Sequence, residues 1–291
     1  MQFADNTQLP FQGKVIWITG ASSGIGEALS YRLSQLGADL ILSARRKQKL
    51  EEVNSKLPRN PGSAKVLPFD LEKLDELPQR VEEALSYYHR VDCLVNNAGL
   101  AIKDFALNTE LSVDQKIMDI NYFAPVVLTK SLLPHFLERK DGHIVVTSSL
   151  SGKFGVPRIA SYTASKHALH GFFETLRSEI AGNNIDITII VLGIISTEIT
   201  AHALTGKGTL YGKVERTFKT GYPVEKTAKK MARAILKKKE EDYIGGPEGI
   251  TLLLNKFSPW LLRRLVRNHP MKKMRQLKRR LGIKSKLKNS N

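Results

Sequence analysis

Tyr162 and Lys166 are the two residues of this chain whose types and spacing most directly indicate acid–base chemistry. Four positions separate them, so on a helix both side chains lie on one face. A phenol has a reference pKa of about 10, and a neighbouring ammonium favours its anion. The pair therefore predicts a proton-transfer centre. The same spacing also occurs between ordinary surface residues, so a second motif is needed to support the prediction.

A glycine-rich segment far upstream provides that second motif. Residues 19–26 (TGASSGIG) follow the apolar run 15–18 and open a helical pattern that stops at Gly37. Strand, glycine-rich turn and helix together form the context that a dinucleotide-binding fingerprint requires. The glycines let the backbone approach a pyrophosphate, and the helix N-terminus offers N–H donors. An ordinary glycine-rich turn is the alternative interpretation.

Together these motifs resemble those of the classical short-chain dehydrogenases/reductases, over about residues 11–250. The resemblance rests on TGASSGIG, on residues 96–99 (NNAG) and on a serine followed by YTASK. Residues 191–198 and 148–153 resemble the 11β-hydroxysteroid dehydrogenase branch, including its Leu192-Gly193 where many members have Pro-Gly. The C-terminal part, from 243 to 259, looks more like uncharacterised bacterial relatives. The resemblance implies an oxidoreductase that interconverts a ketone and a secondary alcohol.

The resemblance also implies a role for each catalytic residue. Tyr162 would act as the general acid on the carbonyl oxygen, and Lys166 would lower its pKa and hold the nicotinamide ribose. Ser149, thirteen residues before Tyr162, would hydrogen-bond the substrate oxygen. Asn121 would hold a water that links Lys166 to solvent; a mid-helix polar residue that bonds locally is the alternative. The chemistry implied in this way uses no metal, and we expect structural or surface roles for His143, His167 and His170.

The end of the second apolar run predicts NADP(H) rather than NAD(H). An NAD site places an acidic residue here, whereas this chain has Ala44 followed by Arg45 and Arg46. A guanidinium binds a 2′-phosphate through bidentate, charge-assisted hydrogen bonds. We expect Arg45 to be the main contact, with Ser43 and Arg46 as helpers, although both arginines could instead be solvated loop charges.

Further cofactor contacts come from the resemblance. Asp70 would bind the adenine amino group, although it could instead cap the helix from Glu72. Small residues after the fourth run would lie against the ribose, and Ile195 and Thr197 would contact the nicotinamide carboxamide. The full predicted cofactor-binding set is Gly20, Ser22, Ser23, Gly24, Ile25, Gly26, Ser43, Arg45, Arg46, Asp70, Leu71, Asn97, Ala98, Gly99, Tyr162, Lys166, Ile195 and Thr197.

The order of elements predicts a single-domain, Rossmann-like α/β fold. Apolar runs at 15–18, 38–43, 65–69, 91–95, 143–147, 185–192 and 242–244 alternate with helical patterns at 24–36, 46–56, 72–88, 112–136, 161–181 and 224–239. This alternation favours a doubly wound parallel sheet of about seven strands with helices on both faces. The predicted domain covers 1–250, including a substrate lid over 196–222 with a short helix near 197–205. A plain surface excursion is the alternative for that segment.

Composition limits the disulfide bonds that the chain can form and the cellular compartment that we expect. The single cysteine, Cys93, lies in an apolar run and excludes an intramolecular disulfide. Residues 1–10 are too polar for a secretory signal, and no apolar stretch is long enough to span a bilayer, so we expect a cytoplasmic protein.

The C-terminal extension, 251–291, forms a separate basic module. The chain carries a net charge of +17, and residues 249–291 contain thirteen Lys or Arg and no acidic residue. Leucines and Val266 in 260–267 fall on one helical face and arginines on the other, and Met271, Met274, Leu277 and Leu281 form a second apolar stripe. This pattern favours either an anionic membrane surface bound through 257–281 or a helix packed on the domain or on a second copy. Nucleic acid is disfavoured because it leaves the apolar stripe unexplained.

Two classes of function stay open at this point. The first is an NADP(H)-dependent oxidoreductase acting on a bulky apolar ketone or alcohol, such as a steroid or lipid, because the predicted lid has few charges. The second is a cofactor-binding regulatory or scaffold protein on the same fold. The presence of all four catalytic residues favours the enzyme. The resemblance also implies a homodimer or homotetramer formed through 112–136 and 161–181.

Overall fold

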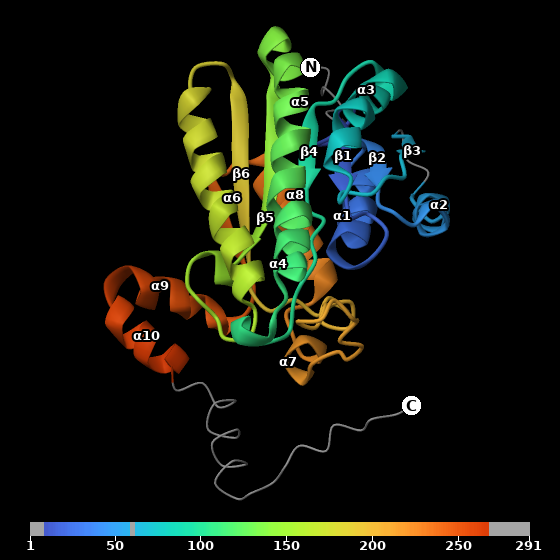
Figure 1. Cartoon of the computed structure of the whole chain (residues 1–291). Helices are drawn as coiled ribbons and strands as arrows, with labels where there is room; N and C mark the ends of the chain where they lie inside the picture. Colours follow the sequence, from blue (N-terminus) through green and yellow to red (C-terminus); the bar gives the residue numbers. More distant parts are fainter. Residues whose placement is uncertain (1–8, 59–61, 268–291) are drawn as a thin grey trace, which may run out of the picture.

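The computed structural model describes residues 9–58 and 62–267, and its centre is a seven-stranded parallel sheet. The strand order is β3-β2-β1-β4-β5-β6-β7, with helices on both faces, as predicted (Figure 1). The strands are β1 (Val15–Thr19), β2 (Asp39–Ser43), β3 (Ala64–Val66), β4 (Cys93–Asn96), β5 (Gly142–Ser149), β6 (Ile185–Leu192) and β7 (Glu241–Ile244). The order reverses between β1 and β4, and in such sheets ligands bind outside the carboxyl ends of the strands at this reversal.

Alternation of side chains along the strands creates two hydrophobic cores. In β1, Val15 and Trp17 face one core and Ile16 and Ile18 the other, and all four are buried. The helices α1 (Gly24–Gln35), α2 (Lys47–Ser55) and α8 (Val224–Leu236) cover one face. The other face is covered by α3 (Leu77–Tyr88), α5 (Ala124–Arg139) and α6 (Ala160–Glu179). Because both faces are covered, the central strands β1, β4, β5 and β6 are almost entirely buried.

Two of the predicted helices differ from the structure. The pattern at 112–136 forms α4 (Leu111–Met118) and α5, joined by a wide π-type turn at Asp119–Phe123. The short helix predicted near 197–205 is wrong, because that segment forms turns. Its path is set by Leu204, whose N–H donates to the Ala101 carbonyl at 2.9 Å and whose backbone bridges to Ile102 and Leu210. A short helix, α7 (Arg216–Lys219), occurs later in the same lid segment.

Two short helices follow the last strand, α9 (Ile250–Phe257) and α10 (Pro259–Arg267). They lie beside the end of the sheet where β5 and β6 finish, near the start of α6 (Figure 1). The predicted second stripe, Met271 to Leu281, lies outside the described residues. Among the residues that the structure describes, no helix is both long and apolar enough to span a bilayer.

Candidate active site

The structure brings the four predicted catalytic residues together at the carboxyl end of β5. Ser149 is the last residue of that strand, and Tyr162 and Lys166 lie one turn apart on α6. Ser149 and Tyr162 share a hydrogen bond. The Lys166 ammonium lies 5.6 Å from the centre of the Tyr162 ring and donates to the Thr147 carbonyl at 2.8 Å. A substrate oxygen placed against Ser149 and Tyr162 would therefore meet two hydroxyl groups.

Burial sets the protonation of this pair. It raises the pKa of Tyr162 to about 12, against the opposing effect of the hydrogen bond with Ser149. Burial also lowers the pKa of Lys166 to about 8. In this arrangement the Lys166 ammonium bonds the Thr147 carbonyl, and the lowering of the Tyr162 pKa by Lys166 stays a prediction. The phenol therefore keeps its proton near neutral pH and is suited to donate it.

Asn121 lies at the π-type turn between α4 and α5, where the wider backbone turns its side chain inward. Its Oδ1 accepts from the Leu100 N–H at 2.7 Å, and its Nδ2 donates to the Leu100 carbonyl at 2.9 Å and to Ser165 Oγ at 3.1 Å. A Cβ on Gly99 would lie 3.4 Å from Asn121 Oδ1 and 3.7 Å from Lys166 Nζ. Asn121 thus joins the segment after β4 to α6. Its partners lie 21 and 44 positions away in the chain, so Asn121 is not the locally bonding residue that we considered as an alternative.

The glycine-rich turn has the shape that a dinucleotide needs. Gly20 has a φ of +69°, and a Cβ there would lie 2.8 Å from Ala98 Cα. A Cβ on Gly26 would clash with the Gly20 carbonyl, so the turn lies directly against the first turn of α1. Ser23, the N-cap of that helix, makes no side-chain capping bond, so the first N–H groups of α1 are not taken by it. These features fit a pyrophosphate at the helix N-terminus.

Side chains at the end of β4 hold this turn in place. The Asn97 Nδ2 donates to the Thr19 carbonyl at 3.0 Å, and the Asn97 and Ala98 N–H groups donate to Thr19 Oγ1 at 3.1 and 3.2 Å. On the other side of the turn, a Cβ on Gly24 would contact the Thr197 methyl at 3.5 Å. Thr197 therefore faces the start of α1, as its predicted cofactor role requires.

The residues at the end of β2 and just after it differ in the exposure of their side chains. Arg45 and Arg46 are exposed, and Arg46 Nη2 lies 3.4 Å from Ser22 Oγ, beside the glycine-rich turn. Ser43 is buried, and its hydroxyl accepts from the Trp17 indole at 2.9 Å, a bond that leaves the O–H available as a donor. Its role beside the arginines stays a prediction.

Asp70 and Leu71 follow β3 at the adenine side of the predicted site. Asp70 Oδ1 accepts from the Glu72 N–H at 3.1 Å, but this is a local turn and not the helix cap that we considered as an alternative, because α3 begins only at Leu77. One carboxylate oxygen bonds in this way, so the second is not committed to this turn. Leu71 packs against the core of the α3 face.

Glu248, which no sequence motif indicated, positions the segment after β6. Its Oε1 accepts from the Ile194 N–H at 2.8 Å and from the Gly246 N–H at 3.0 Å. Burial alone would raise the pKa of Glu248, but these N–H donors outweigh it and the pKa is lowered. A Cβ on Gly193 would clash with this carboxylate, which explains a glycine there. Ile195 is buried beside it, and its neighbours Ile194 and Ser196 pair with Tyr222.

The lid segment packs over the loop that follows β4. Lys103 forms an ion pair with Glu215 at 2.9 Å, and the Lys103 N–H donates to the Leu204 carbonyl at 2.8 Å. A nearby apolar cluster consists of the buried residues Ile102, Val113, Ile117 and Leu204, and Leu100, Ile159 and the Tyr162 ring pack against it. The catalytic phenol therefore lies at the edge of an apolar surface.

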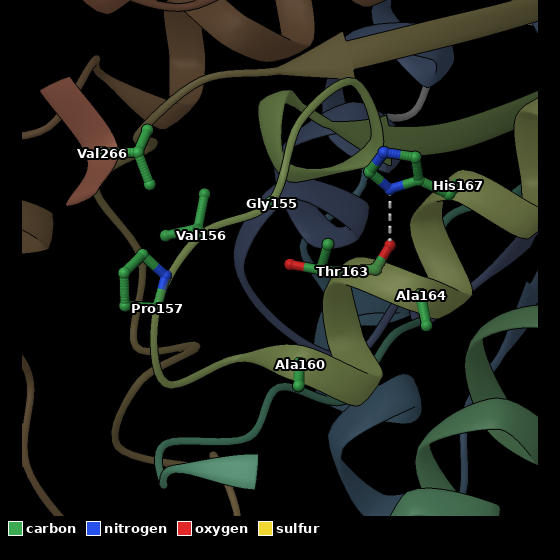
Figure 2. Close-up of a pocket in the computed structure, with 8 residues that line it drawn as sticks. All are labelled: Gly155, Val156, Pro157, Ala160, Thr163, Ala164, His167 and Val266. Carbon is green, nitrogen blue, oxygen red and sulfur yellow. Dashed lines mark hydrogen bonds between the residues drawn. The ribbon is translucent and has the colours of Figure 1, made fainter. Parts of the chain in front are cut away.

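A separate, mainly apolar hollow of about 570 Å³ lies between α6 and α10 (Figure 2). Thr163, Ala164 and His167 of α6 line one side, Gly155 to Pro157 another, and Val266 of α10 also lines it. His167 Nδ1 lies 2.9 Å from the Thr163 carbonyl. None of the four catalytic residues lines this hollow, so it is distinct from the active site.

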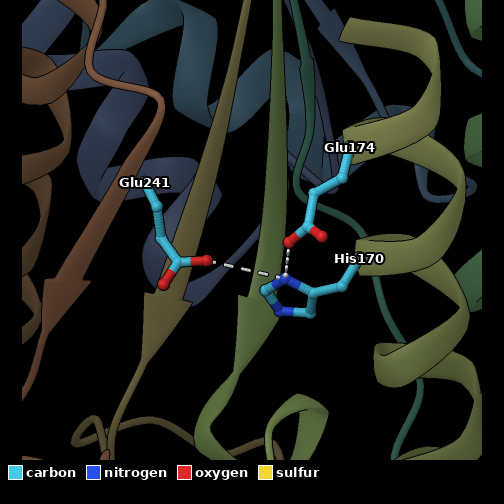
Figure 3. A group of neighbouring side chains, drawn as sticks. All are labelled: His170, Glu174 and Glu241. Carbon is cyan, nitrogen blue, oxygen red and sulfur yellow. Dashed lines mark hydrogen bonds and ion pairs between the residues drawn. The ribbon is translucent and has the colours of Figure 1, made fainter. Parts of the chain in front are cut away.

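The histidines have the structural or surface positions that we expected, with one addition. His143 Nε2 bonds Thr188 Oγ1 at 2.8 Å, and burial lowers the pKa of His143 to about 4. His170 has two carboxylate neighbours, since Glu174, one helical turn further along α6, and the distant Glu241 lie 3.3 and 3.6 Å from its Nδ1 (Figure 3).

This cluster already contains its own cation. The Lys153 ammonium lies 2.7 Å from Glu241 Oε2 and 4.0 Å from Glu174 Oε1. His170 Nε2 bonds Ser148 Oγ at 2.9 Å. The group therefore forms an ion-pair network that ties α6 to β7 behind the catalytic serine.

Comparison with known proteins identifies relatives across most of the chain. The family model described as short chain dehydrogenase matches residues 14–207. A Drosophila melanogaster protein called "Dehydrogenase/reductase SDR family protein 7-like" is 43% identical over 240 residues, which cover 80% of this chain and 72% of the fly protein. The Bos taurus "Dehydrogenase/reductase SDR family member 7B" is 35% identical over 265 residues, covering 89% and 82%.

Solved structures agree with this fold. A metagenomic short-chain oxidoreductase in complex with NADP is 26% identical with a TM-score of 0.67, over 81% of this chain and 98% of that one. A short-chain dehydrogenase/reductase from Burkholderia phymatum in complex with NAD has a TM-score of 0.77 at 22% identity, over 87% and 96%. The second similarity shows the fold alone.

Proposed function

Since this chain belongs to the short-chain dehydrogenase/reductase family, and is thus an oxidoreductase that binds a nicotinamide cofactor, we propose that it reduces bulky apolar ketones with NADPH. The observation that carries the proposal is the meeting of Ser149, Tyr162, Lys166 and Asn121 at the end of β5. Lys166 would also serve cofactor binding, but a protein that only binds the cofactor would not need the Ser149 and Tyr162 hydroxyl groups in contact.

Each catalytic residue has a defined part in the reaction. When bound, the nicotinamide supplies the hydride. Tyr162 donates its phenolic proton to the substrate oxygen, and the raised pKa keeps that proton in place until charge develops on the oxygen. Ser149 donates a second hydrogen bond to the same oxygen and stabilises the developing charge. Lys166, with its pKa lowered to about 8, can exchange protons near neutral pH. Asn121 holds the neighbouring Ser165 through a hydrogen bond.

The preference for NADPH is supported by the charges after β2. Arg45 and Arg46 are exposed beside the glycine-rich turn, and Arg46 already reaches Ser22. The position that carries an acidic residue in NAD-specific sites is Ala44 in this chain. A 2′-phosphate there would meet two guanidinium groups and no opposing carboxylate from this strand end. One solved relative is described in complex with NADP and another in complex with NAD.

The apolar substrate class is supported by the cluster against which the Tyr162 ring packs. Leu100, Ile159 and the phenol pack against the same apolar cluster, to which the lid contributes Leu204. An apolar surface of this kind favours a steroid- or lipid-like carbonyl over a small polar one. We also propose a homo-oligomer formed through α4, α5 and α6, which would cover the exposed Phe123.

Cofactor specificity tests the proposal directly. The ratio of kcat/KM for NADPH to that for NADH should exceed about tenfold in the wild-type protein, because a charge-assisted phosphate contact contributes about 1.5–3 kcal/mol. Arg45→Asp should reverse the ratio, whereas Lys49→Asp, a change on the neighbouring helix α2, should leave it in place. Equal use of both cofactors, or an unchanged ratio in Arg45→Asp, would refute the NADPH preference.

A further inference from the structure

The two C-terminal helices present an apolar surface to solvent. Ile250, Leu253 and Phe257 recur at intervals of three and four residues, so they share one face of α9, and all three are exposed. Trp260 and Leu265 of α10 are also exposed, with Trp260 62% and Phe257 75% accessible. These five residues define the α9–α10 surface. Side chains of this size are costly to leave in water unless something covers them.

Basic side chains accompany this surface, and acidic ones are absent from both helices. Lys256, Arg263, Arg264 and Arg267 are all exposed. The Lys256 ammonium lies 5.3 Å from the centre of the Phe257 ring, so a basic group lies directly beside the apolar face of α9. A partner that covers this patch must offer an apolar interior and negative charge at its boundary.

The helices already use a different face to pack on the domain. Leu262 is buried, and Val266 lines the hollow beside α6. Asn255 Nδ2 donates to the Lys153 carbonyl at 2.9 Å, which ties α9 to the segment after β5. The exposed apolar residues therefore lie outside the contacts that hold the helices, and their apolar character calls for another explanation.

We propose that the α9–α10 surface docks on an anionic phospholipid bilayer. The apolar side chains would enter the acyl boundary, Trp260 would lie at the headgroup level, and the four basic residues would pair with anionic headgroups. α9 and α10 lie at the end of the molecule where β5 delivers Ser149 and where the lid segment lies (Figure 1). Docking would thus bring the catalytic end close to the membrane. Docking itself is independent of the reaction, but delivery of a membrane-dissolved ketone rests on the proposed function.

The two tryptophans of the chain allow a direct test with the full-length protein. Trp17 is buried in the sheet, whereas Trp260 is exposed. Vesicles of phosphatidylcholine with about 30% phosphatidylserine, and brominated acyl chains as quencher, report whether a tryptophan enters the bilayer. We expect quenching and a blue shift in the wild-type protein, reduced by high salt. Trp260→Phe should remove the quenching, because Trp17 stays in the core. An unquenched wild-type protein would overturn the proposal.

A matched pair of variants tests the patch itself. Leu253→Glu/Phe257→Glu should lower the vesicle partition coefficient about tenfold or more, whereas Leu236→Glu, on an exposed apolar residue of α8, should bind like the wild type. Equal binding by both variants would overturn the proposal. So would conversion of a dimer into monomers by the double change, since the patch would then be an interface between copies. Unchanged NADPH turnover of a water-soluble ketone in these variants separates failure of docking from failure of the proposed reaction.

Discussion

Replacing Glu248 with alanine should weaken cofactor use although this residue lies outside the catalytic group. Its carboxylate accepts from the Ile194 and Gly246 N–H groups at 2.8 and 3.0 Å and lies against Gly193. It therefore fixes the backbone path that leads from β6 to Ile195 and Thr197. Those two residues are the predicted contacts of the nicotinamide carboxamide. Without the carboxylate this backbone segment would lose its hydrogen bonds, and the two predicted cofactor contacts would no longer be held in position.

The magnitude follows from the two bonds. Each hydrogen bond to a charged acceptor contributes about 1.5–3 kcal/mol, and the half-buried position lets water replace part of that. We therefore expect Glu248→Ala to destabilise the protein by about 3 kcal/mol, equivalent to a fall in Tm of about 6 °C in a chain of this size. Glu248→Gln keeps an acceptor oxygen and loses only the charge, so about 1 kcal/mol is expected.

Thermal unfolding and steady-state kinetics measure both effects. The KM for NADPH should rise about tenfold in Glu248→Ala, because the loss of one cofactor contact of about 1.4 kcal/mol corresponds to a tenfold change in affinity. Glu248→Gln should show a smaller rise. The exposed Glu240→Ala serves as a control and should change neither quantity. The reasoning is refuted if Glu248→Ala keeps the wild-type Tm and the wild-type KM for NADPH.

Two further substitutions test the fold around the site. Asp92 accepts from Arg139, Arg90 and the Val15 N–H; burial raises its pKa, but these bonds outweigh burial and lower it. A lowered folded-state pKa means that this stabilisation is complete above the unfolded-state pKa of about 3.9 and is lost as pH falls through the folded value. Asp92→Asn should therefore cost about 2–3 kcal/mol in urea unfolding at pH 7, with the difference shrinking below pH ~4, and a pH-independent difference would contradict this. Gly26→Ala should abolish NADPH binding in a fluorescence titration because its Cβ would clash with the Gly20 carbonyl, and normal affinity would show that the turn can relax.

Features encoded by short spacings could be predicted from the sequence. The strand, glycine-rich turn and α1 are adjacent in the chain, and the separation of Tyr162 from Lys166 matches one helical turn, so local pattern was sufficient. The burial of Ser43 could not be predicted from the sequence, because its hydroxyl bonds Trp17, which lies in a neighbouring strand. The helix expected at 197–205 failed for a similar reason, since Leu204 bonds a distant loop rather than its own turn.

Contacts between distant segments explain what the sequence could not reveal. Glu248 lies 54 positions after Ile194, and only the parallel pairing of β6 with β7 brings the two together. The network of His170 with Glu241 has the same origin, because β7 crosses beside α6. No spacing rule connects such residues, so the positions of these carboxylates emerge only with the sheet order.

Turnover by wild-type and Tyr162→Phe protein is the most direct test of the proposed reaction. NADPH consumption would be followed across apolar ketones, from steroids to long-chain compounds, with NADPH binding measured separately. The account predicts turnover of at least one class by the wild type and a fall in kcat of about 10²–10⁴-fold in Tyr162→Phe, with NADPH affinity unchanged. Near-normal turnover in Tyr162→Phe would contradict the assigned proton donor. A wild-type protein that binds NADPH and reduces none of these ketones would favour a cofactor-binding regulatory role instead.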